Sequence, residues 1–263
     1  MITRPESEPA LRPARTPGRR IAFSAALLLA ASAALGCASN GVPHENDPWE
    51  GLNRPLFTVH DGIDTYFFAP LAKGWRFVTP LVVRDSVRHF FENLRYPVVV
   101  VNTLLQGKPT QAGIETGRFL VNSTVGVAGL FDPATGWGMP RVEEDFGQTL
   151  GVWGVGPGPY LVIPLVPGPT TVRDALGSVV DWPLAIYPFF LDWWITAPAR
   201  LLYGVNVRSY YIEEVQDAKA TSLDYYAFMR NAFLSNRQAQ IEDRAEQPRD
   251  RRFEELYYPD EEE

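Results

Sequence analysis

The feature that most constrains this sequence is a stretch that is rich in glycine, proline and apolar residues. It runs from residue 146 to residue 174 and reads FGQTLGVWGVGPGPYLVIPLVPGPTTVRD. Glycine allows positive φ and a close approach of other backbone segments, whereas proline fixes φ and removes an N–H donor. An ordinary helix would not contain this much glycine and proline, and a solvated loop would not be this apolar.

Two interpretations of this stretch remain open. In the first, it is an irregular loop of the protein core with a short strand at Tyr160–Ile163. In the second, it lies at membrane depth, where non-helical backbone is tolerated if protein buries it or if it lines a cavity.

The start of the chain predicts export and lipidation. Arginines at positions 12, 15, 19 and 20 precede an apolar run, residues 21–35, which has the length of a signal peptide and is too short for a spanning helix. Small residues then precede Cys37, the only cysteine. We expect residues 1–36 to be a lipoprotein signal peptide and the Cys37 thiol to be acylated; the alternative is a plain secretory signal with an unpaired thiol. The residue after the cysteine is Ala38, and in this position the chain resembles lipoproteins that are sorted to the outer membrane of diderm bacteria.

Charge and composition limit the partners and the domain organisation that the mature chain can have. The full chain carries a net charge of −7, and removal of residues 1–36, with five Arg and two Glu, makes it more acidic still. This acidity argues against a nucleic-acid partner, which needs a basic face. Residues 37–48 are expected to be a lipidated tether, 49–235 a single domain, and 236–263 an acidic, disordered tail. A lone cysteine excludes an intrachain disulfide, so the fold must depend on packing.

The domain is expected to be mainly α-helical. Thr79 and Pro80 predict a helix start, with Pro97 ending that helix. A second helix is expected from about Thr110 to Val121. Thr221 with Asp224 resembles a capping box, followed by an apolar stripe at Tyr226, Met229 and Phe233. No heptad run or alternating strand series is present, so at most a short β element near Tyr160–Ile163 is expected.

The segment from Leu176 to Val205 is the most apolar part of the mature chain. It cannot be one straight spanning helix, because Pro183, Pro188 and Pro198 interrupt it. It forms either a buried aromatic core, as a helical hairpin, or a set of short helices that lie against lipid.

Residues for catalysis are hard to find. Apart from His44 in the tether, the chain has only His60 and His89, and it contains no H-x-x-x-H pair, second cysteine or G-x-S-x-G motif. Glu143, Glu144 and Asp145 are interpreted as a solvated charge run rather than an acid–base pair. We therefore expect neither an enzyme nor a metal or cofactor site.

A series of short motifs carries a family resemblance. The motifs are DPWEGLNR at 47–54, Phe57, Asp64, PLA at 70–72, WR at 75–76, NL at 93–94, Pro97, Asn102, LQG at 105–107, RF at 118–119, NST at 122–124, GLFD at 129–132 and the glycine–proline stretch. Their order and spacing, from about residue 47 to residue 235, resemble the VacJ/MlaA family of outer-membrane lipoproteins. His60 stands where the family usually has Asn.

The resemblance implies a ring of broken, amphipathic helices in the inner half of the outer membrane, with a central amphipathic pore. It implies removal of mislocalised glycerophospholipids from the outer leaflet, their transfer to a soluble periplasmic carrier, and association with a porin. The rival hypotheses are a structural lipoprotein that scaffolds a porin and, less favoured, an enzyme that acts on phospholipids.

Within that framework, two groups of residues are candidate sites. Gly151, Gly154, Gly156 and Gly158 are the candidate gate of the channel, because glycine absorbs changes of backbone conformation. The candidate contacts to the lipid headgroup are Arg173, Asp174, Arg200 and Arg208. Each of these charged residues would otherwise cap a helix or form an ion pair.

Overall fold

The computed structural model describes residues 45, 47–164, 166, 168–185 and 192–243. The chain divides into two compact units, residues 1–41 and 42–263, and all described residues belong to the second. The predicted signal peptide, Cys37, most of the tether and the acidic segment after Asp243 lie outside the described residues.

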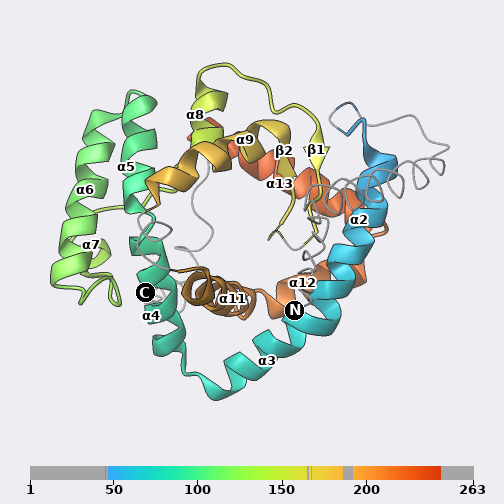
Figure 1. Cartoon of the computed structure of the whole chain (residues 1–263), viewed down its shortest axis with the longest axis horizontal. Helices are drawn as coiled ribbons and strands as arrows, with labels where there is room; N and C mark the ends of the chain where they lie inside the picture. The colour runs from blue at the N-terminus through green and yellow to red at the C-terminus, as the bar shows by residue number, and fades with distance from the viewer. Residues whose placement is uncertain (1–44, 46, 165, 167, 186–191, 244–263) are drawn as a thin grey trace, which may run out of the picture. The chain divides into compact units, whose positions relative to one another are not determined.

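The described part is mainly helical, as predicted (Figure 1). Its helices are α2 (Glu50–Ile63), the π-helix η1 (Asp64–Phe68), α3 (Ala69–Val78), α4 (Leu81–Asn93), α5 (Tyr96–Leu105), α6 (Pro109–Thr124), α7 (Pro133–Gly136), α8 (Phe146–Val152), α9 (Val172–Asp181), the 3₁₀ helix η2 (Trp182–Leu184), α11 (Trp193–Arg208), α12 (Ile212–Thr221) and α13 (Tyr225–Ile241). The strands are β1 (Tyr160–Leu161) and β2 (Thr170–Thr171), which pair antiparallel with Tyr160 opposite Thr171.

Several predicted helix boundaries need correction. Pro80 is the N-cap of α4, and Thr79 ends α3. Pro97 lies in the first turn of α5 rather than at the end of α4, because the N–H that proline lacks has no partner in a first turn. The cap of α13 is Asp224, whose side chain accepts a hydrogen bond from the Ala227 amide at 3.1 Å. Thr221 instead ends α12, so it is not part of a capping box.

The glycine–proline stretch is only partly irregular. Its first residues form α8, capped by the Asp145 side chain, which accepts from the Gln148 amide at 2.9 Å. Gly147 fits inside this helix because α9 packs directly on it: a Cβ atom on Gly177 would lie 2.3 Å from the Gly147 nitrogen. The irregular part, residues 153–159, is called the glycine–proline loop below. The expected short strand at Tyr160–Ile163 is present as β1.

The apolar segment 176–205 contains the last part of α9, all of η2 and most of α11, so within the described residues it is a set of short helices. Pro183 lies at the start of η2, as a helix breaker should. Pro198, however, lies inside α11 and does not interrupt it, contrary to the prediction. Pro188 lies outside the described residues. In the part of the chain that is described, no helix is both long and apolar enough to cross a bilayer.

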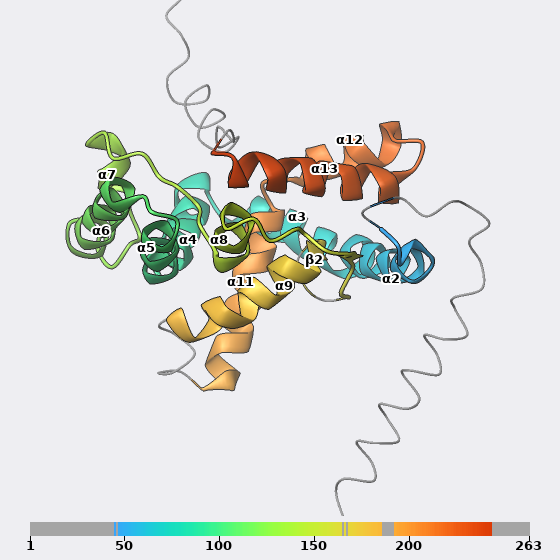
Figure 2. The same cartoon turned by 90° about the horizontal axis from the view of Figure 1, so that it is seen from above.

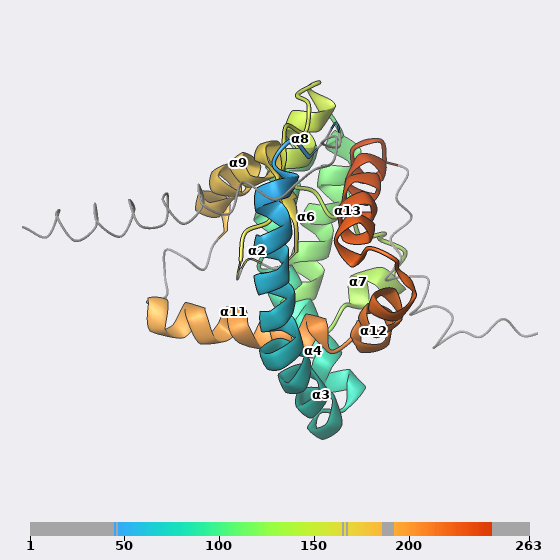
Figure 3. The ribbon, with the colours of Figure 1, turned by 90° about the vertical axis from the view of Figure 1, so that its right-hand side faces the viewer.

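Neighbouring helices of the second unit pack in a closed series of contacts. The series passes from α3 to α11, α4, α6, α5, α8, α13 and α12, and then returns to α3. Figure 2 shows α12 and α13 lying together on one side of this unit. Figure 3 shows α2 beside α13, and the Arg54 guanidinium joins the two helices through the Asp224 carboxylate at 2.7 Å. Segments from both ends of the domain therefore meet.

The apolar core is small. One cluster consists of Phe57, Tyr160, Val162 and Tyr226, with Met229 and Phe233 packed against it, which confirms the predicted stripe of α13. A second joins Ala72, Val205 and Ile212. Among the described residues, buried polar and charged side chains outnumber buried apolar ones, while many large apolar side chains are exposed. The domain therefore reverses the usual preference for apolar residues inside.

Candidate functional site

In two helices of the domain, α9 and α6, polar side chains are buried and apolar side chains are exposed. On α9, Arg173, Asp174 and Gly177 are buried, whereas Leu176 and Val179 are 59% and 69% exposed. Helical spacing places these two sets on opposite faces. Large exposed apolar surfaces mark sites that contact protein or membrane rather than water.

The helix α6 repeats this pattern. Glu115, Arg118 and Asn122 follow one face and are buried, while Leu120 is 57% exposed. Arg118 donates to the Tyr96 hydroxyl at 2.9 Å and to the Asp132 carboxylate at 2.7 Å. The buried cation is thus matched by an anion and by neutral acceptors, as a buried charge requires.

The glycine–proline loop is exposed along most of its length and is fastened at both ends. At its start, the Trp153 indole N–H donates to the carbonyl of Leu105, the last residue of α5, at 3.1 Å. At its end, the first residues of α9 donate to loop carbonyls: Val172 N to Pro159 O at 3.1 Å, and Arg173 N to Pro157 O at 3.1 Å. The Arg173 guanidinium adds a bond to the Val155 carbonyl at 3.3 Å. Residues 154–156 lie between these attachments.

The four candidate gate glycines fall into two settings. Gly154 has φ +87°, and nothing would touch a Cβ atom there or at Gly156 within 4 Å. Gly158 has φ +67° and lies against Val172. Gly151 lies in α8 rather than in the loop, and a Cβ atom on it would be 2.7 Å from Ile241 Cδ1 of α13. Three of the four therefore belong to the loop, and the fourth lies in α8, where it contacts the side chain of Ile241.

The candidate headgroup contacts are engaged with other groups of the protein. Arg173 pairs with Asp174 at 3.0 Å. Arg208 donates to both carboxylate oxygens of Asp64, at 2.8 and 3.1 Å. Arg200 is exposed on α11. The structure brings Arg173 and Asp174 to the loop, while Arg200 and Arg208 lie on another helix; contact of any of the four with a headgroup stays a prediction.

Residues 143–145 are not a solvated charge run, contrary to the prediction. Glu144 is buried and accepts from Gln106 at 2.7 Å and from Lys108 at 3.1 Å. Asp145 caps α8 and binds Arg237 of α13. Burial acts to raise the pKa of Asp145, but the hydrogen bonds and charge of Arg237, with the Gln148 amide, outweigh it, and the pKa lies below its ordinary value. Glu144 and Asp145 thus have protein partners in place of water, which is why the prediction of a solvated charge run is wrong.

The guanidinium of Arg237 was not anticipated from the sequence. It contacts two carboxylates at the starts of two helices: Asp145 at 2.5 and 2.7 Å, and Asp174 at 3.1 Å. Anions are stabilised near helix N-termini, and the arginine offsets the repulsion between the two carboxylates. The one available signal was its spacing from Arg230, because residues seven apart on a helix share a face.

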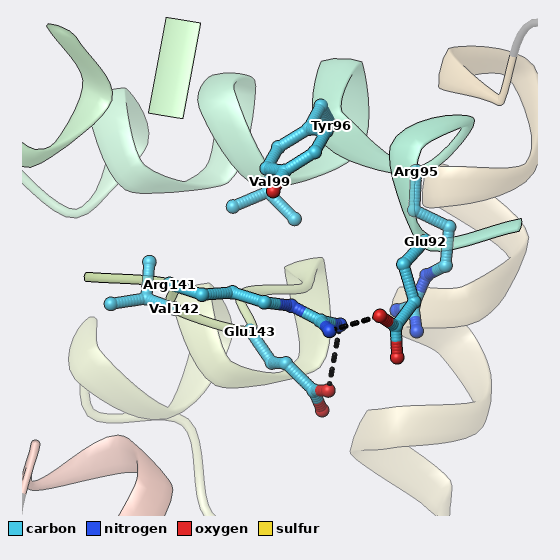
Figure 4. A pocket seen from close by; sticks show the side chains of 7 residues that line it. All are labelled: Glu92, Arg95, Tyr96, Val99, Arg141, Val142 and Glu143. Carbon is cyan, nitrogen blue, oxygen red and sulfur yellow. Dashed lines mark hydrogen bonds and ion pairs between the residues drawn. The ribbon is translucent and has the colours of Figure 1, made fainter. Parts of the chain in front are cut away.

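A small pocket lies between α4, α5 and the segment that leads to α8 (Figure 4). Its lining consists of Glu92, Arg95, Tyr96, Val99, Arg141, Val142 and Glu143. Arg141 forms ion pairs with Glu92 and, at 3.0 Å, with Glu143, as the dashed lines show. The charged side chains of the pocket wall thus neutralise one another, and the pocket is part of the packed polar interior. Among the described residues, no group of three or more His, Cys, Asp or Glu could hold a metal ion.

Comparison with known proteins identifies the family. The sequence model of the family described as MlaA lipoprotein matches residues 45–240, which is most of the chain. This chain belongs to the MlaA family. The match begins just before Asp47 and ends in the last turn of α13, so the MlaA domain includes Arg237. The helix α13 continues beyond residue 235, the expected end of the domain, and its Arg237 and Ile241 side chains contact α8 and its cap.

Two relatives illustrate the similarity. The protein of Escherichia coli (strain K12) named "Intermembrane phospholipid transport system lipoprotein MlaA" is 34% identical over 80% of this chain and 84% of its own. The protein of the same name from Haemophilus influenzae is 33% identical over 82% of this chain and 89% of its own. A solved structure described as "Structural basis for maintenance of bacterial outer membrane lipid asymmetry" matches with a TM-score of 0.67 and 32% identity. It covers 74% of this chain and 98% of the solved one. These findings confirm the resemblance to MlaA proteins.

Proposed function

We propose that this protein is an outer-membrane lipoprotein of a phospholipid transport system. In this proposal it removes mislocalised glycerophospholipids from the outer leaflet through an amphipathic channel and passes them to a soluble periplasmic carrier. The names of its relatives and the subject of the similar structure support the phospholipid part of this role. Acylated Cys37 would anchor the chain, and a porin would be its partner in the membrane.

The observation that carries the proposal is the reversed distribution of side chains. Exposed apolar residues on successive helices would contact acyl chains, while polar and charged groups lie inside. The closed series of helix contacts from α3 back to α3 supports a ring, which we propose encloses the channel. The short helices would lie within one half of the bilayer.

A polar passage would lower the barrier for lipid movement. Transfer of a polar or charged headgroup into hydrocarbon without partners costs several kcal/mol, on the order of 2–7 for a neutral polar group. A channel wall with polar side chains replaces the partners lost from water, while the acyl tails remain in an apolar environment. The glycine–proline loop would act as the gate, since Gly154 and Gly156 have free space around them. The direction of flow would come from the partners.

Substitution of a loop glycine tests the gate. In cells that carry Gly156→Val in place of the natural protein, we expect phospholipid in the outer leaflet to rise, at normal protein level and localisation. Gly113→Val is the matched control, because Gly113 also has nothing within 4 Å of a Cβ atom but lies in α6. Unchanged lipid asymmetry in Gly156→Val, or an equal rise in Gly113→Val, would refute the gate.

We also propose that the protein acts without breaking bonds in the lipid. Purified protein incubated with phospholipid vesicles is expected to release no free fatty acid. It should instead co-purify with phospholipid and transfer it to the carrier. Release of fatty acid would favour an enzyme, and the absence of both bound lipid and transfer would favour a purely structural lipoprotein.

A further inference from the structure

The helix α13 connects the start of the domain to the frame of the glycine–proline loop. Two arginines one heptad apart make these connections. Arg230 binds Asp47 at 3.1 Å and Glu50 at 3.4 Å. Arg237 binds Asp145, the cap of α8, and Asp174, in the first turn of α9. The helix α13 therefore contacts both the start of the domain and the starts of α8 and α9, in each case through an arginine that pairs with two carboxylates.

The frame of the loop is the junction of α8 and α9. The first of these helices leads into the loop, and the second follows it through the β1–β2 hairpin. Their N-terminal ends touch without any space for a side chain, since a Cβ atom on Gly147 would lie 2.6 Å from both Asp174 Oδ1 and Arg237 Nη2. Arg237 is thus packed into the junction itself. Any displacement of its guanidinium must change how the two helices meet.

A continuous series of contacts leads from this junction to the loop. Asp174 Oδ1 accepts from Arg237 at 3.1 Å and from Arg173 Nε at 3.0 Å. Arg173 in turn donates its backbone N–H to Pro157 O and its guanidinium to Val155 O, at 3.1 and 3.3 Å. The orientation of Arg173 therefore depends on a carboxylate that Arg237 also holds.

Two further contacts fix the end of α13 over α8. Ile241 packs against Gly151 of α8, with its Cδ1 atom 2.7 Å from where a Cβ atom on Gly151 would lie. Asp243 accepts from Lys108 at 2.6 Å, and Lys108 also binds the buried Glu144. The position of Arg237 is therefore determined by packing as well as by charge.

We propose that Arg237 is a positioning residue that sets, from α13, the conformation of the glycine–proline loop. Its importance for lipid passage depends on the function proposed above, but its effect on the loop does not. Loss of the guanidinium would leave Asp145 and Asp174 without their shared cation. The α8–α9 junction would open locally, and Arg173 would hold the loop carbonyls less often.

Hydrogen exchange of the full-length lipidated protein in detergent tests this inference. We expect the amides of Trp153, Gly154 and Val155, which donate to carbonyls of α8, to exchange about tenfold faster in Arg237→Gln, because the loop opens more often. Arg76→Gln is the control, since it also removes an arginine ion pair, with Glu213, but lies on α3 and does not touch the α8–α9 junction. It should leave exchange in the loop within about twofold of the natural protein. Arg237→Lys keeps the charge without the planar fork and should lie between these results.

The outcomes separate this inference from the proposed function. Loop exchange in Arg237→Gln equal to that of the natural protein, or equal acceleration by Arg76→Gln, would overturn it. If Arg237→Gln does not fold, Arg237→Lys decides the question by the same comparison. Faster loop exchange with unchanged lipid asymmetry in cells would support the positioning role and would count against the loop as a gate.

Discussion

The Tyr226 hydroxyl donates a hydrogen bond to the carboxylate of Asp47, 179 residues earlier in the chain. Asp47 is fully buried and also accepts from Asn53 at 2.8 Å and from Arg230 at 3.1 Å. Asn53 in turn binds the Tyr160 carbonyl and the Val162 amide. One carboxylate thus joins the beginning of the domain to α13 and, through Asn53, to β1.

Removal of the Asp47 carboxylate should strongly destabilise the domain. Asp47→Ala removes the shorter of the two ion pairs of the buried Arg230 and leaves only Glu50, at 3.4 Å; breaking a buried pair typically costs about 3–5 kcal/mol. Arg76→Gln is the control, because Arg76 and Glu213 form an exposed ion pair and such pairs contribute roughly 0–1 kcal/mol. Unfolding in denaturant, in detergent solution, measures both variants. Equal stability of the two would show that the Asp47 cluster does not hold the domain together.

The contact between α8 and α9 should not tolerate a single added methyl group. Gly177→Ala places a Cβ atom 2.3 Å from the Gly147 nitrogen, and such overpacking costs about 1–3 kcal/mol or more. Gly113→Ala adds the same group inside α6, where nothing lies within 4 Å, and should stabilise by about 0.5–1 kcal/mol. Thermal unfolding of the two variants should therefore shift in opposite directions. A neutral Gly177→Ala would mean that the two helices do not meet at these glycines.

Acid should weaken the junction through Asp145. Its pKa in the folded protein lies below the ordinary value of 3.8, so the stabilisation is complete above the pKa of the unfolded chain and is lost as the pH falls through the folded value. Asp145→Asn, which cannot ionise, should be less stable than the natural protein at pH 7. The difference should shrink below about pH 4, the region of the unfolded Asp pKa. A stability difference that is the same at pH 7 and pH 3 would contradict this assignment.

The apolar exterior should hold the domain at a membrane even without lipidation. Residues 38–263, exported behind a cleavable signal that does not direct acylation, are expected to stay with membranes after a salt wash. Leu176→Asp with Val179→Asp should release part of the protein, since a charge costs roughly 2.5–3.5 kcal/mol at the bilayer centre and less near its surface. Gln216→Asp, an exposed position on α12, is the control. A fully soluble unlipidated chain would contradict the proposed contact with lipid.

Local patterns were sufficient for much of the fold. The stripe at Tyr226, Met229 and Phe233 and the helix near Thr110 follow from helical spacing, and the short strand at Tyr160 follows from apolar residues between prolines. Of the four candidate gate glycines, Gly154, Gly156 and Gly158 lie in the glycine–proline loop, whereas Gly151 lies in α8. The sequence does not predict α8, because glycine disfavours a helix locally. At Gly147, however, the close packing of Gly177 favours glycine. Tertiary contacts outweigh local propensity at such positions.

The polar partners could not be derived from the sequence. Arg237 and Asp145 are separated by 92 residues, and Arg208 and Asp64 by 144. No pattern in a single sequence assigns such pairs. For the same reason, Glu144 was interpreted as solvated although Lys108 and Gln106 surround it. The sequence therefore predicts which segment of the chain holds the candidate site. Only the structure shows the ion pairs that support that segment.

The exposed apolar side chains also bear on how the protein travels. In an aqueous compartment, residues such as Phe77, Leu176 and Trp194 would favour self-association of newly made copies. In the proposed membrane role, such a chain would need an escort that shields it between export and its bilayer, and a shortage of that escort would be expected to show first as aggregates.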